Sequence, residues 1–314
     1  MATGIVSQSV RSSEPFPVPT VESGFKSRAS VYEIVTQQVI KQLESGVAPW
    51  RKPWRTEMPC NLISGKTYRG INIFLLGMQG RSSKYWLTFK QANQLGGHVR
   101  AGEKASTVTF WSVGEEKLDP ETGKKSKPFL LRYYAVFNAT QIDGLETLKL
   151  GNASQPVPNI DVCEAIISGM PNPPRFEASN AAWYRPTLDT VGLPSKDSFN
   201  SSEEFYSTLF HELAHSTGHT SRVGRDAIER PEAFGSDSYS REELVAEMGS
   251  AILCGITGIA PATLQNSAVY LKTWIERLKS DSRLLVSAAS AAQKASDYIL
   301  GHSQTVEPET EGGN

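Results

Sequence analysis

Residues 211–215 read His-Glu-Leu-Ala-His, and these residue types at this spacing can build a hydrolytic metal site. On an α-helix, positions i and i+4 lie on one face, so His211 and His215 can direct both imidazoles at the same ion. Glu212 would then border the adjoining cleft, where a carboxylate can act as general base toward a water molecule. A surface helix that merely carries these residues is the alternative, but with five histidines in 314 residues the pattern is rare by chance. It predicts a zinc metalloprotease.

A third protein ligand must lie elsewhere, because a catalytic zinc takes three ligands and leaves its fourth position to water. The candidates are His219, Glu243 and Glu247. His219 would lie one turn past His215, but Gly218 is typical of a helix end and would redirect the chain. The spacing HELAHSTGH is also too short for the HExxHxxGxxH pattern of metzincins.

The downstream acids lie in the segment REELVAE, residues 241–247, which resembles the second zinc-binding helix of gluzincins. That resemblance implies Glu243 as the third ligand and Glu247 as the acid that supports one ligand histidine from behind. A solvated helix face is the alternative for these acids, most of all for Glu242.

Two further features of the site stay open. Two imidazoles and one carboxylate accept Mn²⁺, Co²⁺ or Ni²⁺ as well as Zn²⁺, which is the expected metal. The oxyanion that develops during peptide hydrolysis needs a hydrogen-bond donor. Tyr239, just before the second helix, and His219 are the candidates for this oxyanion or substrate contact, although Tyr239 can equally serve in packing.

The helix that carries the HELAH motif is predicted to begin near Ser201, which with Glu204 has the pattern of a capping box. Phe205, Leu209 and Leu213 form the apolar face that anchors it. Periodicity predicts further elements in this half: a helix over 241–254, two core-packing helices around 270–278 and 284–299, and short strands at 182–184 and 188–192.

Charge is divided unevenly along the chain, although the total is only −1. Residues 28–150 hold 18 basic and 10 acidic side chains, a net charge of +8, whereas residues 151–314 hold 12 and 21, a net charge of −9. Such asymmetry indicates a nucleic-acid-facing module joined to a different one. We therefore predict an α+β fold class with two domains, with these boundaries: a flexible tail at 1–27, a DNA-binding domain at 28–150, a linker at 151–160, a metallopeptidase domain at 161–300 and a tail at 301–314.

The basic half is predicted to begin with a helix capped by Ser30 and Glu33 and to contain strands at 107–111 and 129–138. Four of the six tryptophans lie there, interleaved with cations. Cations can follow phosphates while aromatic rings stack on the bases of a single strand. The alternative is that these rings form the core. The expected DNA contacts are Trp50, Arg51, Lys52, Trp54, Arg55, Lys66, Tyr68, Arg69, Lys84 and Trp86.

Composition excludes several other classes of protein. Hydrophobic residues make up 39% and charged residues 21%, which is the balance of a globular chain. No apolar run approaches the roughly 20 residues of a membrane span, so no membrane partner is expected. Three widely spaced cysteines argue against a disulfide framework and for a cytoplasmic protein. A monomer is the expected state.

Several motifs together resemble the ArdC/TraC-type antirestriction proteins, which conjugative plasmids and related mobile elements encode. The N-terminal domain of that family is matched by SVYEIVTQQVIKQLESGVAPWRKPW, CNLISGKTYRGINIFLL, KYWLTFKQANQLGGHVRAGEKAS and YYAVFNATQIDGL. Its metallopeptidase domain is matched by HELAHSTGHTSRVGR and SREELVAEMGSAILCG. Ser64 stands where relatives frequently have Thr and Ser216 where many have Trp, and these departures put no catalytic residue in doubt.

The resemblance implies a domain that binds single-stranded DNA without sequence preference, joined to a gluzincin-like zinc peptidase domain. It also implies protection of incoming plasmid DNA from host restriction during conjugation. Our leading hypothesis is a DNA-binding metalloprotease, for which a host protein is the candidate substrate. One alternative is a DNA-coating protein whose peptidase domain is structural or regulatory. A primase-associated accessory protein is a weaker one, because no polymerising motif is evident.

Overall fold

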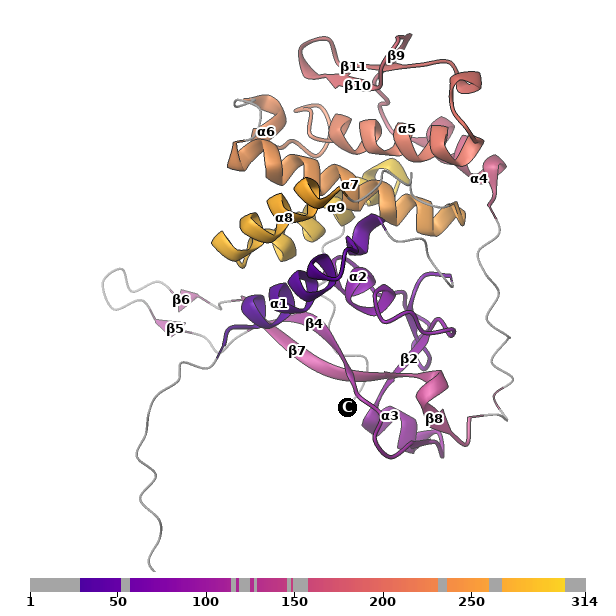
Figure 1. The fold of residues 1–314 in the computed structure, drawn as a ribbon, viewed down its shortest axis with the longest axis vertical. Helices are drawn as coiled ribbons and strands as arrows, with labels where there is room; N and C mark the ends of the chain where they lie inside the picture. Colours follow the sequence, from indigo (N-terminus) through magenta and orange to yellow (C-terminus); the bar gives the residue numbers. More distant parts are fainter. Residues whose placement is uncertain are drawn as a thin grey trace, which may run out of the picture.

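The structure, a computed structural model, describes residues 29–51, 57–113, 117–118, 125–126, 129–145, 148, 158–230, 236–259 and 267–302. We call the described residues up to 148 the N-terminal module and residues 158–302 the C-terminal module. Helices and strands are mixed in both, and the two modules are stacked along the long axis of the molecule (Figure 1). The α+β, two-domain architecture predicted from the sequence is confirmed.

The N-terminal module is built on a four-stranded sheet of order β1-β2-β7-β4, in which only β1 and β2 are parallel. Ser30 caps the first helix through a capping box with Glu33, as predicted. The elements are α1 (Val31–Glu44), the 3₁₀ turn η1 (Pro49–Arg51), β1 (Cys60–Asn61), α2 (Ile71–Gly77), β2 (Tyr85–Thr88), α3 (Phe89–Gln94), β3 (His98–Val99), β4 (Ser106–Val113), β5 (Lys117–Leu118), β6 (Lys125–Ser126), β7 (Phe129–Asn138), η2 (Ala139–Gln141) and β8 (Ile142–Asp143).

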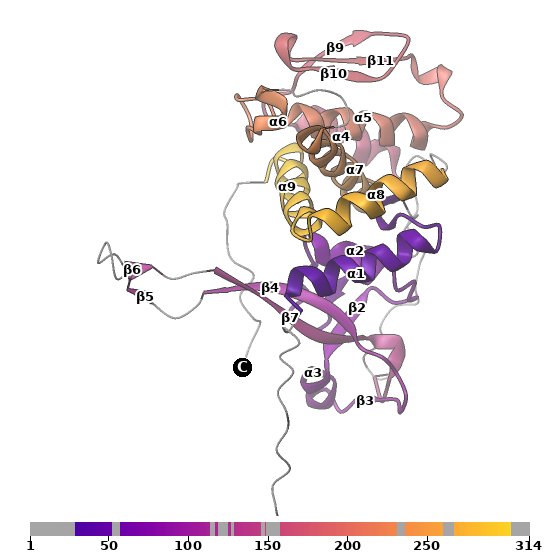
Figure 2. The same ribbon diagram turned by 60° about the vertical axis from the view of Figure 1, so that its left-hand side comes forward.

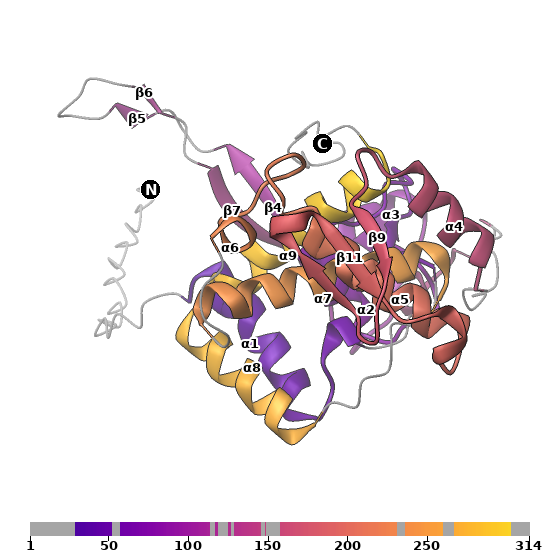
Figure 3. The same cartoon turned by 90° about the horizontal axis from the view of Figure 1, so that it is seen from above.

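The C-terminal module places a three-stranded sheet of order β10-β11-β9 over a layer of helices (Figure 3). Within that layer α7 is central, because it packs against both α5 and α9. The elements are α4 (Ile160–Gly169), β9 (Arg175–Ala178), β10 (Trp183–Arg185), η4 (Pro186–Leu188), β11 (Thr190–Leu193), η5 (Lys196–Ser198), α5 (Ser202–Ser216), α6 (Asp226–Glu229), α7 (Asp237–Thr257), α8 (Ala268–Ser280) and α9 (Leu284–Ile299).

The largest hydrophobic cluster crosses the boundary between the modules. Val39 and Leu43 of α1 belong to the same cluster as Met248 of α7, Trp274 of α8 and Leu285 of α9. Figure 2 shows α1 lying beside α8 along most of its length. The two modules therefore share a core, and the N-terminal module helps to hold α7 in place.

Three of the aromatic residues expected to contact DNA are in the core. Trp50 is 1% exposed, Tyr68 6% and Trp86 2%, so none of them presents a ring to solvent on which a base could stack. Trp50 instead packs edge-on against Trp274, with 5.8 Å between ring centroids. The prediction of base stacking is wrong for these three residues, and the alternative of a core role is right. Lys52, Trp54 and Arg55 lie outside the described residues.

Within the described residues, none of the helices combines the length and the apolar run that a bilayer crossing requires. Cys60, Cys163 and Cys254 are all free, buried thiols, consistent with the expectation of no disulfide framework.

Candidate metal centre

Two sets of contacts orient helix α5, which carries the HELAH motif. One set caps its N-terminus, and the other buries its apolar face. Ser201 is the N-cap and accepts a hydrogen bond from the backbone N–H of Glu204 at 3.2 Å. The predicted capping box is incomplete, since the Glu204 carboxylate accepts from the backbone of Asn200 rather than from Ser201. Tyr206, Leu209, Phe210 and Leu213 bury one face in a core cluster shared with α7.

Helix α7 approaches α5 closely enough for the two to share one site. At the crossing, a Cβ on Gly249 would lie 3.1 Å from the Cβ of Ala214, which is tighter than an ordinary van der Waals contact, so the two helices are in close contact there. Nearby, the Ser250 hydroxyl donates to the backbone carbonyl of Ser207 at 2.8 Å. This close contact fixes where the first turns of α7, which carry the acids, lie relative to the histidines.

His211, His215 and Glu243 converge on one point. The two Nε2 atoms lie 3.1 Å apart, and each lies 3.7 Å from an oxygen of Glu243. Ligands about 2.0–2.1 Å from a tetrahedral ion are about 3.3 Å from one another, so these separations fit a single first-row divalent metal. Among the described residues, this is the group of His, Cys, Asp and Glu side chains arranged to hold an ion.

The acid that lies against a candidate ligand histidine is Glu242. Its Oε1 lies 3.1 Å from His215 Nδ1, on the side of the ring away from Glu243, and only 5% of the residue is exposed. The alternative of a solvated helix face is therefore wrong for Glu242. Arg225 holds the same carboxylate with two hydrogen bonds, Nε to Oε2 at 2.8 Å and Nη2 to Oε1 at 2.6 Å.

Glu247 has a different set of contacts, and its predicted role beside a ligand histidine is wrong. Its carboxylate pairs with Arg51 of η1 at 2.6 Å and accepts a hydrogen bond from the Tyr270 hydroxyl at 2.5 Å. Arg51 in turn lies over the ring of Tyr270, 3.6 Å from its centroid. Arg51, expected to contact DNA, is thus engaged in a buried contact between the modules.

The electrostatics of the site shift the pKa values of its two histidines in opposite directions. Burial, together with the positive charges of His215 and Arg51, lowers the pKa of His211 well below its usual value. Burial opposes the charged form of His215, but Glu242, Glu243 and Glu212 outweigh it and raise that pKa. The same carboxylates would attract a metal cation.

Glu212 is placed for proton transfer. It is 8% exposed, and burial with the nearby negative charge of Glu243 raises its pKa to about 7, despite the opposing charge of His215. A carboxyl group whose pKa lies near neutrality can both accept and return a proton at that pH.

The two candidates for the oxyanion contact differ in their surroundings. Burial, the charge of Glu243 and a hydrogen bond to that residue raise the pKa of Tyr239 to about 12, so its hydroxyl keeps its proton beside the site. The His219 ring instead lies 2.8 Å from the Ser221 hydroxyl, and His219 is not part of the group that could hold an ion. Because its hydroxyl is protonated and interacts with Glu243, Tyr239 is the better placed of the two candidates.

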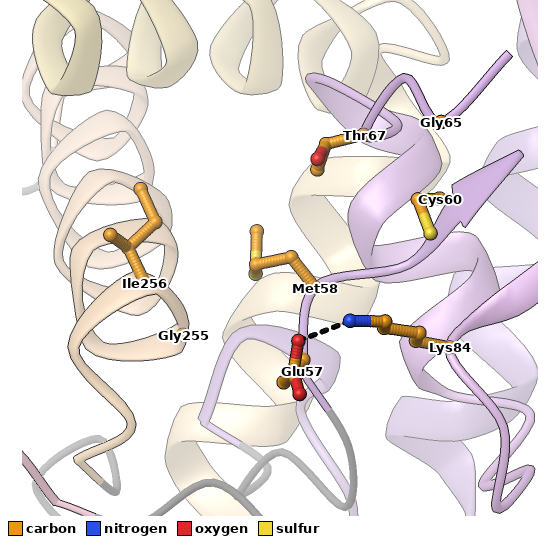
Figure 4. Close-up of a pocket in the computed structure, with 8 residues that line it drawn as sticks. All are labelled: Glu57, Met58, Cys60, Gly65, Thr67, Lys84, Gly255 and Ile256. Atoms are coloured by element: carbon orange, nitrogen blue, oxygen red, sulfur yellow. Dashed lines mark hydrogen bonds and ion pairs between the residues drawn. The ribbon is translucent and has the colours of Figure 1, made fainter. Parts of the chain in front are cut away.

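The remaining predicted DNA contacts are divided. Lys66 is exposed, whereas Arg69 pairs with Asp297 of α9. Lys84 pairs with Glu57 in a cavity of about 320 Å³ between the N-terminal module and the end of α7 (Figure 4). None of the three candidate metal ligands lines this cavity.

Two exposed aromatic residues that are not among the expected DNA contacts lie on the sheet. Trp111 of β4 is 39% exposed and Tyr133 of β7 is 51% exposed. Trp111 pairs with Leu131 and Tyr133 with Thr109, so the two rings are diagonal neighbours on one face. The signal available in the sequence was the strand alternation itself, which separates the two faces but does not say which is covered.

The chain matches two family descriptions in order. Residues 29–137 match the N-terminal domain of anti-restriction factor ArdC, and residues 164–291 match a zincin-like metallopeptidase. Two Escherichia coli proteins named DNA primase TraC are each 37% identical, over 87% and 90% of this chain. The chain spans only 27% and 21% of their length. The Sinorhizobium fredii protein y4eC is 31% identical, over 86% of this chain and 91% of its own length.

Solved structures of antirestriction ArdC from plasmid R388 have the same fold. The metal-free structure is 38% identical with a TM-score of 0.70, covering 86% of this chain and 96% of that one. The Mn(II)-bound structure is 35% identical with a TM-score of 0.67, covering 89% and 100%. With this identity and coverage, and with both domain descriptions matched in order, the chain belongs to the ArdC family of antirestriction proteins.

Proposed function

We propose that this protein binds single-stranded DNA without sequence preference through its N-terminal module and hydrolyses peptide bonds of a host protein at the centre formed by His211, His215 and Glu243. In this way it would protect incoming plasmid DNA from restriction during conjugation. The observation that carries the proposal is the convergence of two imidazoles and a carboxylate beside a buried carboxyl group, Glu212.

The zincin-like domain and the Mn(II)-bound relative support a divalent metal at these residues, and Zn²⁺ is the ion we propose. A bound divalent ion would lower the pKa of a water molecule and polarise the carbonyl of the scissile peptide. Glu212 would accept the proton of the attacking water and return it to the leaving amine. Tyr239, protonated at neutral pH, would donate to the developing oxyanion.

Metal binding should stabilise the folded protein. At a free metal concentration about 100 times Kd, binding to the folded state adds about 2.7 kcal/mol, or roughly 5–10 °C in Tm. We expect Zn²⁺ or Mn²⁺ to produce this shift in chelator-treated wild-type protein and little of it in Glu243→Ala. His219→Ala should retain the full shift. The opposite result for these two variants would make His219, rather than Glu243, the third ligand.

The DNA surface that we favour is the part of β4 and β7 that carries the exposed, diagonally adjacent rings of Trp111 and Tyr133. This replaces the buried rings Trp50, Tyr68 and Trp86. The net charge of +8 over residues 28–150 supports contact with phosphates.

Trp111→Ala and Tyr133→Ala should each weaken binding of an oligothymidylate by roughly 5- to 150-fold, because stacking contributes about 1–3 kcal/mol per base. Fluorescence anisotropy at several salt concentrations measures this, and affinity should fall as salt rises. Phe176→Ala, which removes a 48% exposed ring of β9, is the matched control and should bind as the wild type does. Equal losses in all three variants, or equally tight binding of duplex DNA, would contradict the assignment.

A further inference from the structure

After the HELAH helix the chain makes a tight turn, which brings Arg225 back into contact with the C-terminal end of that helix. Gly224 adopts a φ of 72°, which favours glycine, and the backbone N–H of Arg225 donates to the carbonyl of Gly218 at 2.8 Å. A Cβ on Gly218 would lie 2.5 Å from the side chain of Ile228, so glycine is also needed there. The two glycines thus return residue 225 to the C-terminal end of α5.

The guanidinium of Arg225 uses its donors on both helices of the metal centre. Toward α5, Nη2 donates to the backbone carbonyl of Ala214 at 2.8 Å and Nη1 to the Thr217 hydroxyl at 2.7 Å. Toward α7, it makes the paired hydrogen bonds to the Glu242 carboxylate described above. The carbonyls at a helix C-terminus have no partners within the helix, and a cation there is favourable.

Glu242 lies between this guanidinium and the His215 ring. Because its carboxylate only accepts hydrogen bonds, the His215 nitrogen that faces it must carry the proton. His215 Nδ1 therefore holds the hydrogen, and the Nε2 lone pair points toward His211 and Glu243. The orientation and tautomer of this ring are set by a carboxylate whose own position is set by Arg225.

We propose that Arg225 is a positioning residue of the metal centre, which holds Glu242 so that the Nε2 lone pair of His215 faces the other two ligands. This inference rests on the metal site of the proposed function and adds a residue to it. Lysine cannot reproduce the paired contact, because its ammonium is a single point donor, whereas the arginine fork matches both carboxylate oxygens.

Arg222, three residues earlier in the same turn, provides a matched control. Its side chain is 0% exposed and makes a similar fork to Asp189, with both contacts at 2.8 Å. It also donates to the backbone carbonyl of Ser216 at 2.9 Å, so it too joins the end of α5 to another element. No contact of Arg222 reaches Glu242, Glu243 or the two ligand histidines among the described residues.

The experiment compares Arg225→Met, Arg225→Lys and Arg222→Met in the full-length protein. The first readout is the Kd for Zn²⁺, measured by competition with a chromogenic chelator. Loss of a residue that orients a ligand typically weakens metal affinity by about 10- to 100-fold, which we expect for Arg225→Met. Arg225→Lys should fall between Arg225→Met and the wild type. Arg222→Met should lower the Tm of the metal-free protein while leaving the Kd unchanged.

The second readout needs no metal. In metal-free protein, at an alkaline pH where the raised pKa of His215 leaves its ring neutral, the ¹⁵N NMR signals of that ring, assigned with a His215→Gln variant, should report the Nδ1–H tautomer in the wild type and in Arg222→Met. In Arg225→Met and Arg225→Lys that single tautomer should give way to a mixture. Unchanged ring signals and an unchanged Kd in the Arg225 variants would overturn the proposal. Ring signals that change as predicted in a protein that binds no metal would support the positioning role and refute the proposed metal site instead.

Discussion

Glu212→Gln is expected to lower peptide hydrolysis by about 10²–10⁴-fold, the usual contribution of a general base. Glutamine has nearly the same shape as glutamate, so the buried side chain keeps its packing and loses only the capacity to accept a proton. The rise of the Glu212 pKa to about 7 through burial is the environment that such a base requires. Release of peptides from unfolded casein by the Zn²⁺-loaded protein provides the measurement.

Two controls separate this loss from damage to the site. The Zn²⁺-induced rise in Tm should be retained in Glu212→Gln, because Glu212 is not one of the three converging ligands. Glu204→Gln, on the first turn of the same helix, should hydrolyse casein at the wild-type rate. Wild-type hydrolysis by Glu212→Gln would show that another residue serves as the base.

The same variant tests whether peptidase chemistry is needed for protection. Transfer of unmodified plasmid DNA into a restricting host should lose the protection given by wild-type protein when Glu212→Gln is supplied instead. Full protection by Glu212→Gln would favour a protein that coats DNA and uses its peptidase domain only for structure or regulation.

Arg51→Met is expected to lower the free energy of unfolding by about 3–5 kcal/mol, because it leaves the Glu247 carboxylate buried without its cation. Burial already raises the pKa of Glu247, against the opposing charge of Arg51 and the hydrogen bond from Tyr270. The ion pair is nearly covered, with each side chain 13% exposed. Urea denaturation of the metal-free protein measures the change.

An exposed ion pair between the same two modules serves as the control. Lys279 of α8 faces Glu44 of α1 with side chains 56% and 52% exposed, so Lys279→Met should cost less than about 1 kcal/mol. The double variant Arg51→Met with Glu247→Leu should recover most of the loss, since an apolar pair needs no counter-charge. Equal, small effects of Arg51→Met and Lys279→Met would mean that the buried pair does not hold the modules together.

The contact of Arg51 with Glu247 and Tyr270 also explains why the residues around Trp50 have a pattern typical of a DNA-binding loop. Tryptophan beside arginine suits base stacking, but it suits a module interface equally well. The Trp50 indole donates to the Tyr270 hydroxyl at 2.9 Å, which in turn donates to Glu247. A sequence pattern shows only residue types, and base stacking and packing at a module interface use the same types.

Local features were predictable because they depend on neighbours in the chain. The spacing of His211 and His215 defines one face of a helix wherever that helix lies, and the cap at Ser30 forms within its own first turn. The long strands at 129–138 and around 107–111 follow from alternation and β-propensity, and both are present. Helix α7 is longer than the predicted 241–254, because Ser236 caps it so that it begins at Asp237, four residues before Arg241, and it continues to Thr257.

The sequence by itself therefore determined which chemical groups the candidate site contains: two imidazoles and a carboxyl group on one helix, acids on another, and a basic half joined to an acidic one. Only the tertiary structure decided which acid supports His215, because the choice between Glu242 and Glu247 depends on how α7 crosses α5. It likewise decided that Trp50 is buried and that Arg225 reaches Glu242. These outcomes arise from packing between segments distant in the chain, and spacing along one helix carries no information about the angle at which another helix meets it.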